Sequence, residues 1–368
     1  MRARTSWGGA LGVLALVSGL LAACAAPSAP AAPAASGSQS TGAVASGSQA
    51  TTAATGGSQA APAPPQKVRA AYVAIASNML PAWLALDEGL YQKYGLDVEL
   101  SYIAGAAKIS EAVMGGDLDF GVAPASSAIG PGLEGADTVM LASWTSKLSF
   151  SALVQASIPA ATELRDKRIG VTRRGSNSEI WANAVLGKFG LQPDRDYTVL
   201  SVGGQTEQLA ALQNGALDAA ILTPPTNLVA RQMGFKELLS YKDYALDFAN
   251  VGVVTTRRYL QAQPDVADRF LRASAEGVAM MLTNDAATRK ALTHYTEVDD
   301  PAMLDETIAF EFSRTARDML PTPEGMRGAM EELANNNPKA VGANPDDFLD
   351  LGPVKRLNDS GFIASLYR

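Results

Sequence analysis

The sequence predicts an α/β protein of two lobes, each a mostly parallel sheet flanked by helices, followed by a helical C-terminal tail. Three observations lead to this expectation. Short apolar runs alternate with amphipathic segments from residue 68 to residue 222. This alternation occurs twice, and in both copies glycine residues end the helices. After Asn250, a single further strand precedes a series of helices. Strands that alternate with helices favour a parallel sheet covered on both faces.

The first lobe is expected to begin with three strand–helix units. Pro81 can open the first helix, because the first turn tolerates a missing backbone N–H. Gly95, Gly105 and Gly115–Gly116 mark the turns and helix ends that separate the elements. The expected strands of this lobe are 68–75, 96–103 and 118–123.

The second lobe repeats the same order of elements. Its expected strands are 167–171, 197–200 and 217–222, and its expected helices are 179–189 and 207–214. The segment 115–121 of the first lobe matches 214–220 of the second: in each, a helix stops at glycine and a short strand follows an aspartate. This repetition favours two similar lobes over one large sheet.

The C-terminal part is expected to return to the first lobe. A strand at 251–254 precedes helices at 264–282, 285–294, 301–312 and 323–333. Connections near 150–154 and 251–255 are expected to link the lobes. The expected boundaries are therefore 67–153 for the first part of lobe 1, 154–252 for lobe 2, and 253–368 for the return and the C-terminal helices.

The N-terminus has the features of an export signal, expected over residues 1–23. Arg2 and Arg4 precede an apolar stretch at 10–21, which is too short to span a bilayer. It ends in Leu-Ala-Ala before Cys24, and this resembles a bacterial lipobox in which the cysteine is lipidated. Cys24 is the only cysteine, so an intramolecular disulfide is excluded. An ordinary secreted protein with a chance cysteine there is the alternative.

A linker is expected to follow the lipidated cysteine, over residues 24–66. It consists almost entirely of Ala, Ser, Gly, Pro, Thr and Gln, without a charged residue between Arg4 and Lys67. Such a composition predicts a flexible tether. The net charge of −7 argues against nucleic-acid binding, which favours basic patches.

Five segments in this order resemble one family of proteins. They are 81–91, 94–100, 115–121, 164–171 and 209–220. The chain resembles the type II periplasmic-binding-protein fold, and within it the family that binds sulfonates, taurine, nitrate and thiamine-precursor pyrimidines. The resemblance implies a solute-binding lipoprotein of an ABC importer, anchored outside the cytoplasm by Cys24. It implies a small-molecule ligand, a permease partner in the membrane, a monomer, and neither cofactor nor metal.

The ligand site is expected in the loops after the strands, because ligands of open α/β sheets bind beyond the carboxyl ends of the strands. Helices also begin there, and their N-termini attract anions. The same small and polar residues populate any such loop and cap any helix, which is the alternative for each loop alone. The candidates are Ser77, Asn78, Met79, Gly105, Ala106, Pro124, Ala125 and Ser126 in lobe 1, and Arg173, Arg174, Gly175, Ser176, Asn177, Gly203, Gly204, Gln205, Thr223 and Pro224 in lobe 2.

Arg173 and Arg174 favour an anionic organic ligand such as a sulfonate or carboxylate. The guanidinium group offers a planar fork of donors that suits these groups. Adjacent side chains in a loop diverge, so one arginine can face the cleft while the other faces solvent; both facing solvent is the alternative. Trp83 and Trp181 lie on expected helix faces and are assigned to the core.

We expect a binding protein and not an enzyme. A pyrimidine synthase of this fold family needs a reactive histidine and a cysteine-rich motif. Here His294 is the only histidine, far in sequence from the strand-end loops, and Cys24 is assigned to the anchor. A binding lipoprotein of a sensor or of another transporter class remains an alternative. Ligand capture is expected to close the two lobes about their hinge.

Overall fold

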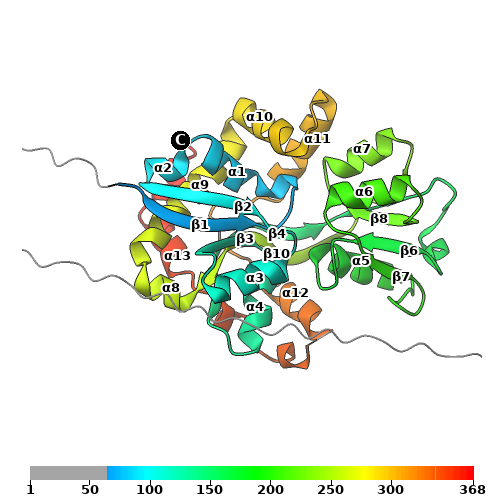
Figure 1. Ribbon diagram of the computed structural model, residues 1–368, viewed down its shortest axis with the longest axis horizontal. Helices are drawn as coiled ribbons and strands as arrows, with labels where there is room; N and C mark the ends of the chain where they lie inside the picture. The colour runs from blue at the N-terminus through cyan, green and yellow to red at the C-terminus, as the bar shows by residue number, and fades with distance from the viewer. Residues whose placement is uncertain (1–63, 336) are drawn as a thin grey trace, which may run out of the picture. The chain divides into compact units, whose positions relative to one another are not determined.

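The computed structural model describes residues 64–335 and 337–368. The expected signal peptide, Cys24 and nearly all of the linker lie outside these residues. Within the described part of the chain, no helix has the length and apolar character that crossing a membrane requires. The described elements form two sheets with helices on both faces of each (Figure 1).

The first sheet is mixed, with the strand order β2-β1-β3-β10-β4. β1 runs parallel to β2 and β3, as predicted, whereas β10 runs antiparallel to β3 and β4. The two antiparallel partners are the strands that carry the chain out to the second lobe and back, so they must run in opposite directions. The strands are β1 (Gln66–Tyr72), β2 (Leu96–Tyr102), β3 (Phe120–Ala123), β4 (Thr138–Ser149) and β10 (Ala245–Thr256).

The second sheet has the corresponding order, β7-β6-β8-β5-β9. β6 is parallel to β7 and β8, and β5 is antiparallel to β8 and β9. The predicted duplication is therefore real: in each lobe the first strand lies between the second and third. The strands are β5 (Ser151–Val154), β6 (Arg168–Val171), β7 (Thr198–Ser201), β8 (Ala219–Leu222) and β9 (Lys236–Leu239).

The chain crosses between the sheets at Phe150 and again at 240–244. The first crossing, at Phe150, precedes the expected boundary after residue 153, so residues 151–153 belong to the second sheet and not to lobe 1. The second lies before the expected 251–255, which is inside β10, so residues 245–252 belong to the first sheet and not to lobe 2. The polar start of β10, at Asp247, hid the beginning of this long strand. The sequence also gave no sign of β4, because Ser and Thr interrupt its buried apolar residues.

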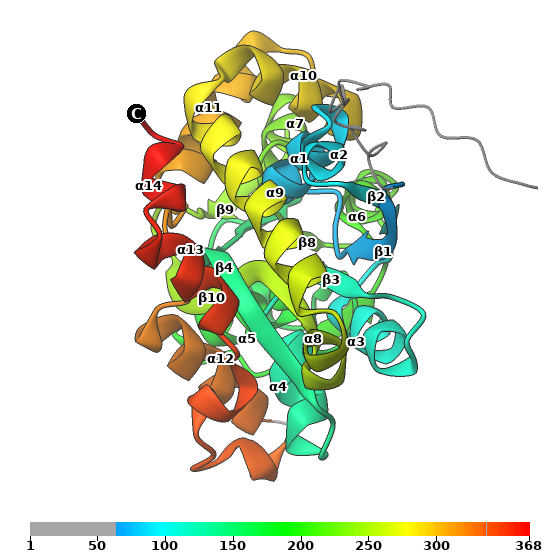
Figure 2. The same cartoon turned by 90° about the vertical axis from the view of Figure 1, so that its left-hand side faces the viewer.

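Helices cover both faces of the first sheet (Figure 2). The long helix α9 packs on α1, and a Cβ atom on Gly277 would lie 2.1 Å from the carbonyl oxygen of Pro81, so only glycine permits this approach. Trp83 is fully buried and stacks on Tyr295, as a core residue does. One face carries α1 (Leu80–Asp87), α2 (Leu90–Lys93), α9 (Pro264–Thr283) and α13 (Gly352–Asp359); the other carries α3 (Ala106–Gly115), α4 (Ser126–Leu133) and α12 (Pro323–Ala334).

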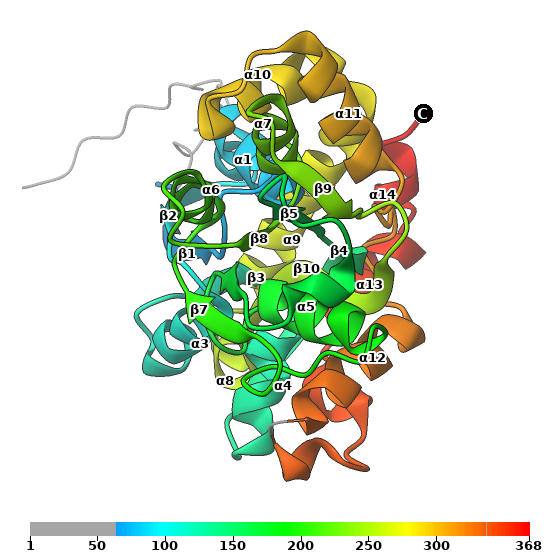
Figure 3. The same ribbon diagram turned by 90° about the vertical axis from the view of Figure 1, so that its right-hand side faces the viewer.

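The second sheet is covered by three helices (Figure 3). They are α5 (Asn177–Gly187), α6 (Gln205–Gln213) and α7 (Thr226–Gln232). Trp181 of α5 is fully buried and donates its indole N–H to the carbonyl of Tyr244, 2.6 Å away, which agrees with its assignment to the core. The remaining helices are α8 (Arg257–Ala262), α10 (Asp285–Thr296), α11 (Pro301–Phe312) and α14 (Phe362–Ser365).

The aspartate of each repeated segment ties the third strand of its lobe to the first. Asp119 Oδ2 accepts the backbone N–H of Arg69 at 2.8 Å, and Asp218 Oδ2 accepts that of Arg168 at 2.9 Å. In both lobes the arginine also pairs with the carboxylate through its guanidinium group, 50 residues away in sequence. The bond from Arg168 lowers the pKa of Asp218. The repeated segments 115–121 and 214–220 therefore correspond to the same aspartate–arginine interaction in both lobes.

We predict that Asp119→Ala and Asp218→Ala destabilise the protein by similar amounts. Each change removes the acceptor of a backbone N–H, which costs about 1–3 kcal/mol of unfolding free energy. Urea unfolding of each variant measures this cost. Asp117→Ala is the control, because Asp117 is exposed and makes no such bond among the described residues. Equal stability of all three variants would contradict the role of the repeated aspartates.

Candidate functional site

A cavity of about 70 Å³ lies where the strand-end loops of the two lobes meet. Both lobes and both crossing strands contribute to it. Its polar lining residues are Asn78 and Tyr102 from lobe 1, Thr172, Ser176, Asn177, Ser178, Gln205 and Thr223 from lobe 2, Ser149 and Asn250 from the crossing strands, and Arg314 from the segment after α11. Its position beyond the carboxyl ends of the parallel strands is the one expected for this class of sheet.

The structure brings part of the predicted set to this cavity. The predicted residues that line it are Asn78, Met79, Gly105, Ala106, Pro124, Ser176, Asn177, Gly204, Gln205 and Thr223. The predicted residues that do not line it are Ser77, Ala125, Ser126, Arg173, Arg174, Gly175, Gly203 and Pro224. The second group includes both arginines, so the charge of the cavity differs from the charge expected from the sequence.

Three helices begin at the cavity wall: α3 from lobe 1, and α5 and α6 from lobe 2. Their N-cap residues are Gly105, Ser176 and Gly204, and none of these caps its helix with a side-chain hydrogen bond. Within the described residues, the backbone N–H groups of 106–108, 177–179 and 205–207 have no acceptor. Free N–H groups and the positive ends of three helix dipoles therefore converge on one small space.

Arg174 points away from the cavity and is already paired. Its guanidinium group donates to Glu179 at 2.9 Å and to Asp194 at 2.6 Å, and its side chain is 48% exposed. The bonds to Asp194 and Glu179 raise the pKa of Arg174. The residue thus fastens the start of α5 to a neighbouring loop of lobe 2.

Arg173 joins the two lobes at the edge of the cavity. Its Nη2 donates to the carbonyl oxygen of Ala104, in lobe 1, at 2.6 Å. The guanidinium group lies directly on Gly105, where a Cβ atom would be 1.7 Å from Arg173 Nε. Gly105 also has a φ of +90°, which disfavours any side chain. Arg173 therefore contributes a hydrogen bond and a packing contact between the two lobes.

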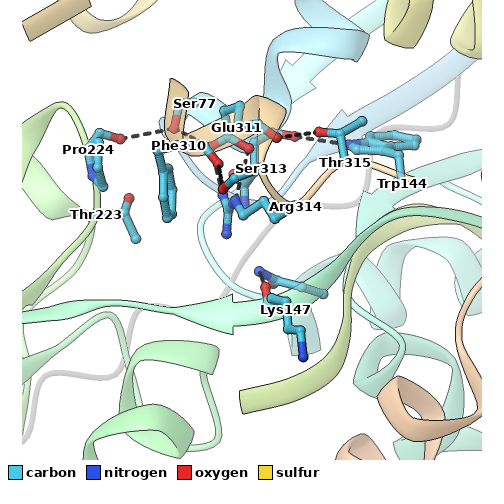
Figure 4. A network of polar contacts seen from close by, with 12 residues as sticks. Ser77, Trp144, Lys147, Thr223, Pro224, Phe310, Glu311, Ser313, Arg314 and Thr315 are labelled. Carbon is cyan, nitrogen blue, oxygen red and sulfur yellow. Dashed lines mark hydrogen bonds and ion pairs between the residues drawn. The ribbon is translucent and has the colours of Figure 1, made fainter. Parts of the chain in front are cut away.

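A buried ion pair includes Arg314, which lines the cavity (Figure 4). Arg314 donates to both carboxylate oxygens of Glu311, at 2.7 and 3.1 Å, and the two side chains are 4% and 1% exposed. The guanidinium group also lies over the ring of Phe310, 3.9 Å from its centre. Among the described lining residues Arg314 is the only cation, and Glu311 neutralises it.

Ser77 extends this pair to the second lobe. Its hydroxyl lies 2.5 Å from Glu311 Oε1 and 3.0 Å from the carbonyl oxygen of Pro224 (Figure 4). One hydroxyl proton can serve only one of the two acceptors at a time. The sequence placed Ser77 and Pro224 near the site but did not indicate Arg314, which follows a helix far from the strand-end loops. The Glu-x-x-Arg spacing of Glu311 and Arg314 was the available signal.

These features define a class of protein: two lobes with corresponding sheets, two crossing strands and a cavity between the lobes form the type II periplasmic-binding-protein fold. The chain belongs to the NMT1/THI5-like family, whose model matches residues 76–287, more than half of the chain.

Solved structures of binding proteins share this fold. The alkanesulfonate-binding protein SsuA of Xanthomonas axonopodis pv. citri is 18% identical with a TM-score of 0.62, and the match covers 77% of this chain and 96% of that one. The periplasmic nitrate-binding protein NrtA of Synechocystis PCC 6803 is 14% identical with a TM-score of 0.64, over 83% and 91% of the two chains. A protein from Bordetella bronchiseptica RB50 is 21% identical with a TM-score of 0.71, over 80% and 97%.

His294 is on α10, packed edge-on against Tyr295, and it does not line the cavity. In the part of the chain that the structure describes, no three His, Cys, Asp or Glu side chains are placed to hold a metal ion. The polar lining of the cavity consists of amides, hydroxyls, the guanidinium group of Arg314 and helix N-termini.

We predict that Glu311→Gln strongly destabilises the protein, because Arg314 would keep its charge without its buried partner. Removing one member of a buried ion pair costs about 3–5 kcal/mol of unfolding free energy. Glu324 and Arg327 provide a matched control, since they form a pair of the same spacing on α12 but are 57% and 60% exposed. Glu324→Gln should cost less than about 1 kcal/mol. Chemical denaturation of both variants makes the comparison, and equal losses would contradict it.

Proposed function

We propose that the protein is the extracytoplasmic solute-binding component of an ABC importer and captures a small organic anion between its lobes. The observation that supports this most directly is the convergence of three helix N-termini, from both lobes, on one cavity. The two named structural relatives bind an alkanesulfonate and nitrate respectively, and both ligands are small anions.

The anion would be bound by backbone N–H groups and hydroxyls and not by a free arginine. The N–H groups at the starts of α3, α5 and α6 are unpaired within the described residues, and helix N-termini stabilise negative charge. The hydroxyls of Ser176, Ser178 and Thr223 also line the cavity, where they bond one another or the side chains of Thr172 and Gln205. The Arg314–Glu311 pair contributes no net charge, so the positive potential would come from the helix ends and from Arg173 at the edge of the cavity.

The size of the cavity favours a small solute. Its volume of about 70 Å³ is smaller than the roughly 150 Å³ of an engineered cavity that holds benzene. A larger solute would require the lobes to separate further than they do in this arrangement. The two crossings, at Phe150 and 240–244, are the segments about which the lobes would move.

Ligand binding would favour the closed arrangement because both lobes supply contacts to it. Contacts between the lobes contribute to the same closure. Arg173 bonds the carbonyl of Ala104, and Tyr241 donates its hydroxyl to Glu306 of α11 at 2.9 Å. The closed form, acting as a monomer, would then dock on the permease subunits.

We propose that Cys24 carries the lipid anchor of the mature protein. The apolar stretch at 10–21 and the small residues before the cysteine support this processing. Cys24→Ser is expected to move the protein from the membrane fraction to the soluble fraction, which immunoblotting of fractionated cells would show. Intact mass of the wild-type N-terminal peptide provides the second readout. The proposed anchor would be contradicted if the variant stayed in the membrane fraction and the wild-type N-terminal peptide carried no lipid.

The ligand class is tested by thermal shift with alkyl sulfonates, carboxylates and nitrate. A ligand at about 100 times its Kd adds roughly 2.7 kcal/mol to the free energy of unfolding, an easily measured shift. Arg173→Ala should weaken every ligand by a similar factor of about ten, because it removes a charged hydrogen bond that closes the lobes. Arg327→Ala is the control and should leave affinity unchanged, because Arg327 is 60% exposed on α12 and does not line the cavity.

Two outcomes would contradict these expectations. Binding of uncharged ring compounds alone would overturn the anionic ligand class. A loss in Arg173→Ala that is confined to anions would assign Arg173 to the ligand and not to closure of the lobes.

A further inference from the structure

The cavity contains two side-chain amides that differ in one respect. Asn78 Oδ1 and Asn177 Oδ1 are both buried and lack a donor within the described residues. Asn78 has no partner for its amide nitrogen there either, so its amide can turn to present either a donor or an acceptor. Asn177 has a partner for its nitrogen, and this partner fixes the orientation of its oxygen.

The orientation of Asn177 follows from a chain of hydrogen bonds that ends on the backbone. The carbonyl oxygen of Lys147 can only accept, so the group 3.0 Å from it must be the amide nitrogen of Asn250. The oxygen of Asn250 then faces Asn177 and accepts from its Nδ2 at 2.6 Å. The remaining atom of the Asn177 amide, Oδ1, is therefore an acceptor.

This relay lies at a break in the pairing of the two crossing strands. Asp247 of β10 pairs with Lys147 of β4, but the next pair is Val251 with Thr145, so the register shifts between them. Asn250 lies within the shifted stretch and is 3% exposed. Its amide bonds the carbonyl of Lys147 at this irregular point, and turning it over would place oxygen against oxygen and nitrogen against nitrogen.

The surroundings of Asn177 Oδ1 favour an uncharged donor on the ligand. An unpaired buried carbonyl oxygen is costly, so a bound solute gains by supplying an N–H or O–H group there. The positive ends of three helices face the same cavity, which disfavours an ammonium group. Among the described residues that line the cavity, none is a carboxylate that would compensate such a group.

We propose that Asn177 is a specificity-determining residue, which selects solutes that carry a hydroxyl or amide N–H donor beside the anionic group. Asn250 is a positioning residue that holds the Asn177 amide in its accepting orientation. The anionic part of this inference rests on the proposed function, whereas the donor part rests on the amide relay alone.

The test uses sets of three probes that differ in one terminal group. The sulfonate set is 2-hydroxyethanesulfonate, propane-1-sulfonate and 2-aminoethanesulfonate; the carboxylate set is 3-hydroxypropanoate, butanoate and 3-aminopropanoate; the uncharged pair is 3-hydroxypropanamide and butanamide. Calorimetric titration of the full chain gives each affinity. The hydroxyl member is expected to bind at least about ten-fold more tightly than the methyl and ammonium members, because a site built for a donor rejects analogues that lack it.

Variants assign this preference to the relay. Asn177→Leu should abolish the preference for the hydroxyl member, and Asn250→Leu should reduce it by leaving the Asn177 amide free to turn. Asn183→Leu, the same change on α5 at a residue that bonds Tyr197 outside the cavity, should preserve it. Melting temperatures verify that each variant is folded, and the Asn250 variant remains informative if Asn177→Leu does not fold.

Each alternative result has a distinct meaning. Equal binding of the hydroxyl and methyl members would show that water satisfies Asn177 Oδ1, and this would overturn the inference while the anion-binding function stands. Preference for the ammonium member would overturn the uncharged donor class. Binding of the uncharged pair alone would overturn the proposed anion, and the donor preference would still be measured within that pair. Absence of binding by every probe would count against both proposals.

Discussion

The antiparallel pairing of β4 with β10 is the constraint on which the rest of the structure depends. Each strand has 12 residues, and the ladder runs from the pair Thr138–Thr256 to the pair Ser149–Ala245. At the latter end β4 continues through Phe150 into the second sheet, while β10 receives the chain from it. The two lobes are therefore joined by paired strands whose hydrogen bonds restrict how the lobes can move.

This pairing also decides which ends of the strands face the cavity. The carboxyl ends of the parallel strands in each lobe face the cavity between the lobes. The helices that follow these strands therefore begin at the cavity. The starts of α3, α5 and α6 consequently meet at the cavity. The convergence of these helix N-termini on the cavity thus follows from the direction in which the chain runs through each sheet.

The sequence predicted the parts of the structure that depend on local signals. The bounds of α11 agree with the expectation because Asp300 accepts the N–H of Met303 and Pro301 occupies the first turn. The loops that line the cavity were also found, since they follow short apolar strands. β4 was missed because it is buried on both faces of a sheet whose other strands are distant from it in the sequence. Such a strand shows no alternation of polar and apolar residues that would reveal it.

The two arginines show why charge in a cavity is harder to predict than its position. Arg173 and Arg174 are adjacent in sequence, yet one bonds Ala104 of the other lobe and one bonds Asp194, 20 residues further on. Neither partner is indicated by spacing along the chain.

Arg314 entered the lining unforeseen, together with the carboxylate of Glu311 that neutralises it. Because Glu311 neutralises this lining cation, the proposed recognition of a solute would depend largely on dipoles and hydrogen bonds of fixed direction. If Asn177 acts as proposed, an amide that cannot turn would discriminate between solutes more sharply than a mobile charged side chain, because the wrong group would meet an unpaired oxygen and not a flexible ion.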